Sequence, residues 1–191
     1  SLNPEGSATK TTTLKTLAGH TNATTCVAFS QDGRQLAYGG EDTSVRIRDL
    51  YSDTPVLALP GHRDEVTQIQ YSPDGALIVT GDQAGMIRMW NAHTGVLLWS
   101  HPAAAEPVWR TVFNSKSTLL ASASGFSGDT GAIQLWDVTT GSAVSLLSQL
   151  PTKSIAFSPD GLTLAAATEE DKTVVTLWDI PTRARRSSFS S

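Results

Sequence analysis

Short stretches in which apolar and polar residues alternate run through most of the chain, separated about every ten residues by turn-forming residues. Alternation with a period of two is typical of β-strands that bury one face, and segments this short predict an all-β fold. The strands predicted in the first unit span residues 26–29, 35–38, 45–47 and 55–59.

One pattern of residues recurs four times along the chain. Its aromatic anchors lie 42, 42 and 44 residues apart, at Phe29, Tyr71, Phe113 and Phe157. A fixed period of this length predicts an array in which each unit buries its apolar face against a neighbour. We therefore expect a leader at residues 1–10 and four repeats at about 11–54, 55–96, 97–142 and 143–191.

Three landmarks recur within the repeats. A Gly-His pair precedes the first strand of two repeats, an Asp-Gly pair suits a hairpin turn in three, and a Trp followed by Asn or Asp ends the third strand in three. The landmarks are Gly19-His20, Gly61-His62, Asp32-Gly33, Asp74-Gly75, Asp160-Gly161, Trp90-Asn91, Trp136-Asp137 and Trp178-Asp179. In their order and spacing they resemble the WD40-repeat family. The resemblance implies four blades of four antiparallel strands, arranged around a channel as a β-propeller.

The resemblance also implies a relay of hydrogen bonds in each blade, from Trp through a hydroxyl and the Gly-His histidine to an Asp. Carried over by position, the residues with this structural role are His20, Asp42, His62, Thr80, Trp90, Ser122, Trp136, Asp171 and Trp178. No repeat is expected to have the full set. The first has Tyr38 and Arg48 at the hydroxyl and Trp positions, and the second has Ala84 at the Asp position, with Asp82 as a substitute.

The third and fourth repeats depart further from the family pattern. Ala104 stands where the third repeat should have its His, and His101, three residues earlier, is a candidate to bridge the loops in its place. The fourth has Ser148 and Ala166 at the His and hydroxyl positions. Each blade should therefore be less firmly clamped than a complete one.

Four blades are fewer than the resemblance leads us to expect, since WD40 rings mostly have seven or eight. At roughly 45–50° for each blade, four form an open arc with a bare apolar face at each end. The chain could be a fragment of a longer ring, half of a ring completed by a second copy, or a tightly closed ring of four. Residues 11–17 and 184–189 both read as outer strands and compete for one place.

Composition and charge exclude several classes of partner. A net charge of −4 argues against binding to nucleic acid, which depends on clustered Lys and Arg. No apolar run approaches the eighteen or more residues of a membrane helix. The single cysteine, Cys26, is compatible with a reducing compartment, so we expect an intracellular protein, cytoplasmic or nuclear.

The candidate binding residues follow from the resemblance, which implies docking on the loops before the first and after the second strand of each blade. They are Trp109, Phe126, Glu41, Arg63, Asp64, Gln83, Glu106, Glu169 and Glu170. Their acidic bias favours a basic peptide as partner. Trp109 and Phe126 are the candidate anchors, because aromatic residues dominate binding energy at interfaces. For Trp109, packing against a neighbouring blade is the alternative.

These observations predict a non-enzymatic scaffold that presents propeller loops to protein or peptide partners. The alternatives are a sensor or regulatory module of a larger multidomain protein and a propeller enzyme. The enzyme is disfavoured because no serine lies in a recognisable nucleophile turn and both well-placed histidines belong to the repeat pattern. We predict no cofactor and no metal site, since paired Cys or His motifs are absent from the sequence.

Overall fold

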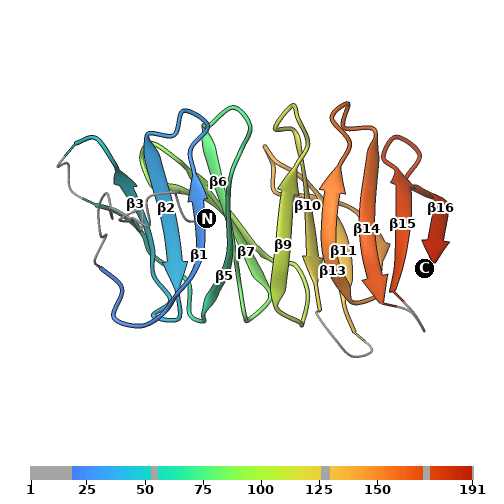
Figure 1. The fold of residues 1–191 in the computed structure, drawn as a ribbon, viewed down its shortest axis with the longest axis horizontal. Helices are drawn as coiled ribbons and strands as arrows, with labels where there is room; N and C mark the ends of the chain where they lie inside the picture. Colours follow the sequence, from blue (N-terminus) through green and yellow to red (C-terminus); the bar gives the residue numbers. More distant parts are fainter. Residues whose placement is uncertain (1–18, 53–55, 126–129, 170–172, 191) are drawn as a thin grey trace, which may run out of the picture.

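The computed structural model describes residues 19–52, 56–125, 130–169 and 173–190, and every regular element in these ranges is a β-strand (Figure 1). The strands form four antiparallel sheets of four, each in sequence order. Sheet 1 contains β1 (Thr24–Phe29), β2 (Gln35–Gly40), β3 (Val45–Asp49) and β4 (Leu57–Leu59). Sheet 2 contains β5 (Val66–Tyr71), β6 (Leu77–Asp82), β7 (Met86–Asn91) and β8 (Leu97–Pro102). Sheet 3 contains β9 (Val108–Phe113), β10 (Leu119–Ser124), β11 (Ala132–Asp137) and β12 (Ala143–Ser148). Sheet 4 contains β13 (Thr152–Phe157), β14 (Thr163–Glu169), β15 (Thr173–Asp179) and β16 (Ala184–Ser190).

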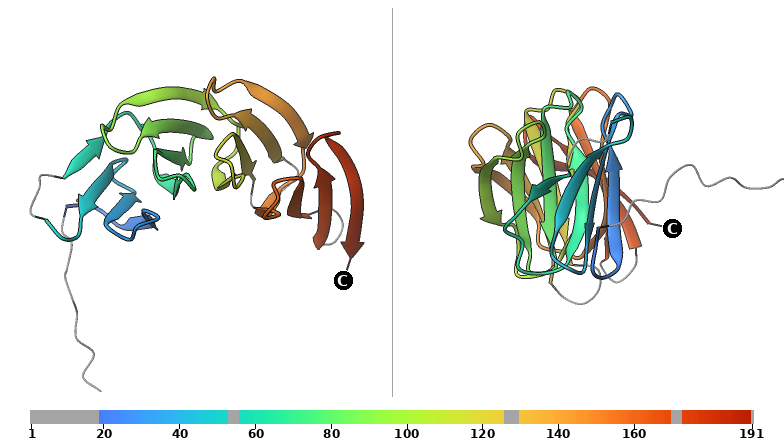
Figure 2. Two further views of the ribbon diagram at one scale, coloured as in Figure 1. Left: turned by 90° about the horizontal axis from the view of Figure 1, so that it is seen from above. Right: turned by 90° about the vertical axis from the view of Figure 1, so that its left-hand side faces the viewer.

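The four sheets stand side by side along an open arc (Figure 2). The first strand of each sheet lies on the concave side, and β1, β5, β9 and β13 contact one another in turn. The all-β architecture of four-stranded antiparallel sheets is confirmed, and the arc is not closed into a ring. The predicted strand at 184–189 is β16, whereas its predicted competitor at 11–17 lies outside the described residues.

Hairpin turns end the first strand of each sheet and fix where the second begins. In sheets 1, 2 and 4 a serine hydroxyl donates to the Asp two residues later, and the following Gly has a φ of 67°, 74° or 72°. Glycine has no Cβ to strain this conformation. Sheet 3 reaches the same turn differently, because Asn114 accepts backbone N–H groups with its side-chain oxygen and Ser117 takes the positive φ.

Apolar side chains are buried between neighbouring sheets, so the core consists of three layers, one at each junction. At the first junction, Ala37, Val45, Ile47 and Leu59 of sheet 1 pack against Val66, Ile69, Tyr71, Ile78 and Trp90 of sheet 2. Small residues allow this close approach. A Cβ at Gly39 would lie 2.9 Å from Val66, and one at Gly81 would lie 2.7 Å from Val108. In sheets 2 and 3, apolar side chains on both faces are therefore buried, one face against each neighbouring sheet.

No helix of the described ranges is long and apolar enough to cross a membrane.

Candidate partner-binding site

Loops gather at one end of the sheets, before each first strand and after each second strand. Backbone hydrogen bonds tie these loops in pairs: Glu41 N–H donates to Ala23, Gln83 to Glu65, and Gly125 to Pro107. The distances are 3.0, 2.9 and 3.2 Å. We call this end the loop rim, defined by residues 20–23, 40–44, 62–65, 83–85 and 103–107. Its backbone is held by the sheets and by these cross-links.

The loop rim carries an excess of negative charge. Its exposed charged side chains include Glu41, Arg63 and Asp64, and Glu65 and Glu106 are half-buried. Glu106 accepts a hydrogen bond of 2.9 Å from the Thr130 hydroxyl. Four of these five side chains are carboxylates. Glu65 adds to the predicted acidic group. It directly follows Arg63 and Asp64 in the sequence, which placed it in the same loop.

Trp109 was expected in a rim loop, and this placement is wrong because the residue lies within β9. It is half-buried and lines a groove of about 640 Å³ along the concave side, formed by β1, β5, β9 and β13. The charged side chains among the described residues that line the groove are Arg110 and Lys153. The structure therefore places Trp109 in this groove together with Arg110 and Lys153.

Two predicted partner-binding residues cannot be placed with the others. Phe126 and Glu170 lie outside the described residues, as does the structural candidate Asp171. Glu169 is the last residue of β14. Gln83 is half-buried, and its amide donates a weak hydrogen bond of 3.4 Å to Glu65.

A complete hydrogen-bond relay clamps sheet 2, so the expectation that no repeat has the full set is wrong. Trp90 Nε1 donates to the Thr80 hydroxyl at 2.9 Å, and Thr80 Oγ1 lies 2.6 Å from His62 Nε2. His62 Nδ1 lies 2.7 Å from Asp82 Oδ2. A carboxylate only accepts, so the contact with Asp82 assigns the proton to Nδ1, and Nε2 then accepts from Thr80. Arg88 Nη1 also lies 2.7 Å from Nδ1. Asp82, rather than a residue at position 84, completes the relay.

Asp82 is the most heavily bonded side chain of this relay. It also accepts from Arg88 Nη1 at 2.8 Å and from the backbone N–H of Met86 at 2.9 Å. Burial acts to raise the pKa of Asp82, but hydrogen bonds from His62, Met86 and Arg88 outweigh it and lower the pKa below 3.8. Asp82 is 1% exposed, so its charge is compensated entirely by these neighbours.

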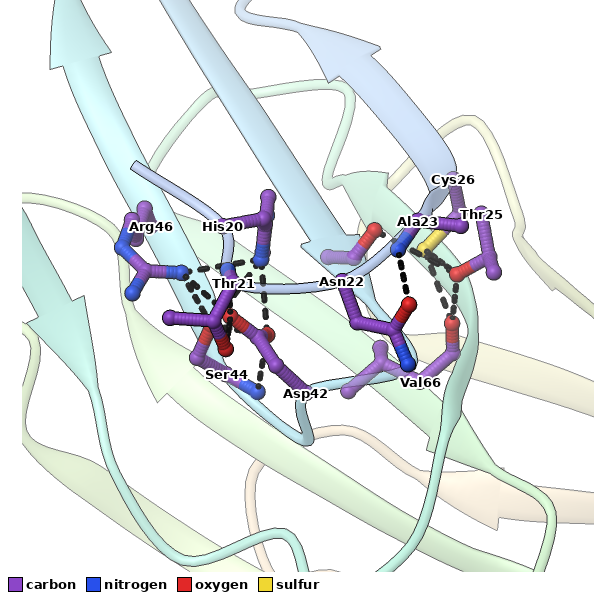
Figure 3. A network of polar contacts seen from close by, with 11 residues as sticks. His20, Thr21, Asn22, Ala23, Thr25, Cys26, Asp42, Ser44, Arg46 and Val66 are labelled. Atoms are coloured by element: carbon purple, nitrogen blue, oxygen red, sulfur yellow. Dashed lines mark hydrogen bonds and ion pairs between the residues drawn. The ribbon is translucent and has the colours of Figure 1, made fainter. Parts of the chain in front are cut away.

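In sheet 1 only the contact between the His and the Asp of the relay is present, and the hydroxyl and the Trp are missing. His20 Nδ1 lies 2.7 Å from Asp42 and 3.0 Å from Ser44 Oγ, with the Arg46 guanidinium alongside (Figure 3). His20 Nε2, the Tyr38 hydroxyl and Arg48 Nε are buried without a hydrogen-bond partner among the described residues. Tyr38 meets His20 edge to face, at 5.1 Å between ring centres, where sheet 2 has a threonine hydroxyl.

The cluster of Asp42, His20 and Ser44 differs from a nucleophilic triad. In a triad the serine bonds one nitrogen of the imidazole and the carboxylate bonds the other, so that the ring can move a proton between them. Here both partners meet Nδ1. This geometry cross-links the two rim loops, and the Ser44 hydroxyl donates directly to Asp42 instead of reaching it through the ring.

The relays of sheets 3 and 4 are incomplete among the described residues. In sheet 3, Trp136 Nε1 donates to Ser122 Oγ at 2.9 Å. His101 was expected as a loop bridge, but it lies in β8, where its ring stacks on Trp136 at 6.1 Å between centres. In sheet 4, Trp178 Nε1 has no partner within the described part of the chain, because Ala166 replaces the hydroxyl.

No cluster of three or more metal-ligating side chains occurs among the described residues. Burial raises the pKa of the Cys26 thiol to about 11, so the thiolate form is scarce at neutral pH. Cys26 packs at the junction of sheets 1 and 2.

The neutral His62 makes stability depend on pH. Burial and, to a smaller degree, the Arg88 charge hold the pKa of His62 below its ordinary 6.5, although Asp82 acts to raise it. As pH falls below 6.5, His62 therefore binds a proton in the unfolded chain before it does so in the folded chain. We expect the free energy of unfolding to fall as pH drops below 6.5, by at most about 1.4 kcal/mol per pH unit for this one group.

Urea unfolding measured at intervals between pH 7.5 and 5 tests this dependence. His62→Gln should flatten the slope, whatever its effect on stability at neutral pH. His93→Gln changes an exposed histidine and should leave the slope intact. An unchanged slope in His62→Gln would show that another group causes the dependence.

Comparison with known proteins finds a family model that matches the first two units and a relative that matches a short segment of the chain. Residues 11–49 and 53–91 match the WD40 family model, described as WD domain, G-beta repeat. A 42-residue segment, 22% of this chain, is 57% identical to the Notchless protein homolog of Arabidopsis thaliana. The matched segment spans only 9% of the length of that relative.

Proposed function

Because this chain carries WD40 repeats, we propose that it is a protein-interaction module that binds a basic peptide segment at the loop rim. WD40 repeats generally act as non-enzymatic interaction platforms, in which the sheets hold the loops still. The excess of carboxylates at the rim carries the basic-peptide proposal, since complementary charge steers and orients a partner.

The proposal extends to the setting of the protein. We place it inside the cell, because its single cysteine is a free thiol. The same rim would serve a free-standing scaffold or a regulatory repeat module within a larger protein. A second copy of the chain is the other partner that we propose, at the bare faces of the end sheets.

Charge removal at the rim should weaken peptide binding. We expect Glu41→Gln with Asp64→Asn to raise the dissociation constant of a labelled Arg-Lys heptapeptide about 2–30-fold, because two exposed charge pairs are lost and each contributes about 0.2–1 kcal/mol. Fluorescence anisotropy at low salt measures this change. Added salt should reduce the difference between the variant and the unchanged chain.

A matched control separates the rim from overall charge. Gln31→Lys with Thr139→Lys also raises the net charge by two, but both positions are exposed in turns at the opposite end of the sheets. This variant should bind the peptide nearly as well as the unchanged chain. Equal weakening in both variants, or no binding by the unchanged chain, would refute the proposed site.

A further inference from the structure

Within the described ranges, each of the two end sheets leaves bare one face that every inner sheet buries. We define the front face of a sheet as the one turned toward the preceding sheet, and the back face as the one turned toward the next. On the front face of sheet 2, Ile69 and Tyr71 are 4% and 6% exposed. Val27 and Phe29, at the same positions of sheet 1, are 60% and 62% exposed.

The back face of sheet 4 is bare in the same way. Val45 and Leu59 line the back face of sheet 1 and are each 1% exposed. In sheet 4, Val175 and its cross-strand neighbour Phe189 occupy the matching positions and are 42% and 59% exposed. The arc therefore ends in two apolar surfaces that its own repeat pattern covers everywhere else.

The bare front face of sheet 1 and the bare back face of sheet 4 correspond to the two sides of the junction between neighbouring sheets, which the chain forms three times. A hollow of about 150 Å³ lies on the back face of sheet 4, lined by residues that include Ala156, Ala165, Ala167 and Val175. By register, Ala167 occupies the position of Gly39, which lies against Ile69 at the first junction. The residue of sheet 1 equivalent to Ile69 is Val27.

We propose that a second copy of this chain covers both bare faces, with Val27 and Phe29 of each copy against the back face of sheet 4 of the other. The inference rests on the proposed interaction module and names its second partner. Both halves of the contact belong to one chain, and both ends of the arc face the same side (Figure 2). Two copies can then meet at both ends at once.

This pairing closes a ring of eight sheets, which is within the range of four to eight blades found in propellers. A contact between unlike faces either closes into a ring or continues as an open filament. Because each copy contributes four sheets, closure after two copies leaves no bare face, whereas a single contact would leave two. The two interfaces of the ring are identical.

Sedimentation equilibrium of the purified chain tests the pairing. The expected mass is twice that of the 20.3 kDa chain at micromolar concentration. Phe29→Asp should shift the mass to that of one chain, with an unchanged far-UV circular dichroism spectrum, since Phe29 makes few contacts within the arc. Tyr51→Asp changes an aromatic residue that is 80% exposed in the connection after β3, outside the strands of both faces, and should leave the pair intact.

A charge exchange tests which faces meet. Val27→Lys and Val175→Asp should each yield single chains on their own, and an equimolar mixture should form the pair, because one interface then joins Lys to Asp and the other is unchanged. No recovery in the mixture would overturn the assignment of these two faces.

Several results would overturn the pairing itself. They are a single-chain mass for the unchanged protein at 100 µM, a ladder of larger masses, or no effect of Phe29→Asp on the mass. Binding of the basic heptapeptide is measured separately on Phe29→Asp. If the unchanged chain does not pair but binds the peptide, only the proposed peptide site at the loop rim is supported. If the unchanged chain pairs but does not bind the peptide, only the pairing of two copies is supported.

Discussion

Replacing Asp82 with Ala is expected to lower the free energy of unfolding by about 3–5 kcal/mol, because it leaves the Arg88 guanidinium buried without its counter-charge. Arg88 is 8% exposed, and its 2.8 Å contact with Asp82 is the ion pair of this relay. The change also removes the acceptor that fixes the proton on His62 Nδ1. Such a loss is a large part of the roughly 5–15 kcal/mol that stabilises an ordinary domain.

Two further variants make the result specific to the relay. Asp42→Ala removes the matching carboxylate of sheet 1, where the Arg46 side chain is 22% exposed and can be solvated, so we expect a smaller loss. Asp82→Ala combined with Arg88→Met should recover part of the stability, because no unpaired charge remains. Urea unfolding of all four proteins at one concentration measures these differences. Equal losses for Asp82→Ala and Asp42→Ala would contradict the relay argument.

Replacing Gly85 with Ala is expected to lower the free energy of unfolding by about 2–5 kcal/mol, through backbone strain and overpacking together. Gly85 has a φ of 75°, which an L-residue adopts at a cost. A Cβ at this position would lie 2.2 Å from the carbonyl oxygen of Ala104 and 2.8 Å from that of Glu106. The loop that joins sheets 2 and 3 would have to move.

Gly75 provides the matched control for this change. Its φ is 74°, but a Cβ there would meet no atom within 4 Å. Gly75→Ala should therefore show only the backbone term, about 1–2 kcal/mol. The difference between the two variants, from urea unfolding, isolates the contact at the junction. If both variants lose the same stability, the close approach at Gly85 is not what limits this position.

Local patterns predicted most of the fold. The period-two alternation located the strands, and the Asp-Gly pairs located the turns, because both depend on neighbours within a few residues. The strand predicted at 26–29 lies within β1, and the one predicted at 35–38 lies within β2. Local geometry alone is enough for such predictions.

The candidate site was harder to predict. In the second repeat, matching to the family pattern placed the Asp position of the relay at Ala84, with Asp82 as a substitute. In the structure Asp82 and Thr80 lie two residues apart on one face of β6, and both contact His62. The period of a strand was the signal that favours Asp82. Trp109 was placed in a loop although Val108, five residues before Phe113, matches the start of β5 at Val66. In both cases, alternation along the strand was more reliable than matching to the family pattern.

The sequence by itself determined that this protein is built of four similar β units, each with two apolar faces, since that information lies in the alternation of each segment. Only the tertiary structure decided which faces are covered. Val27 and Ile69 have the same pattern around them, yet one is bare and the other buried. The physical reason is that burial depends on the neighbour that stands beside a sheet, and an open arc provides none at its two ends.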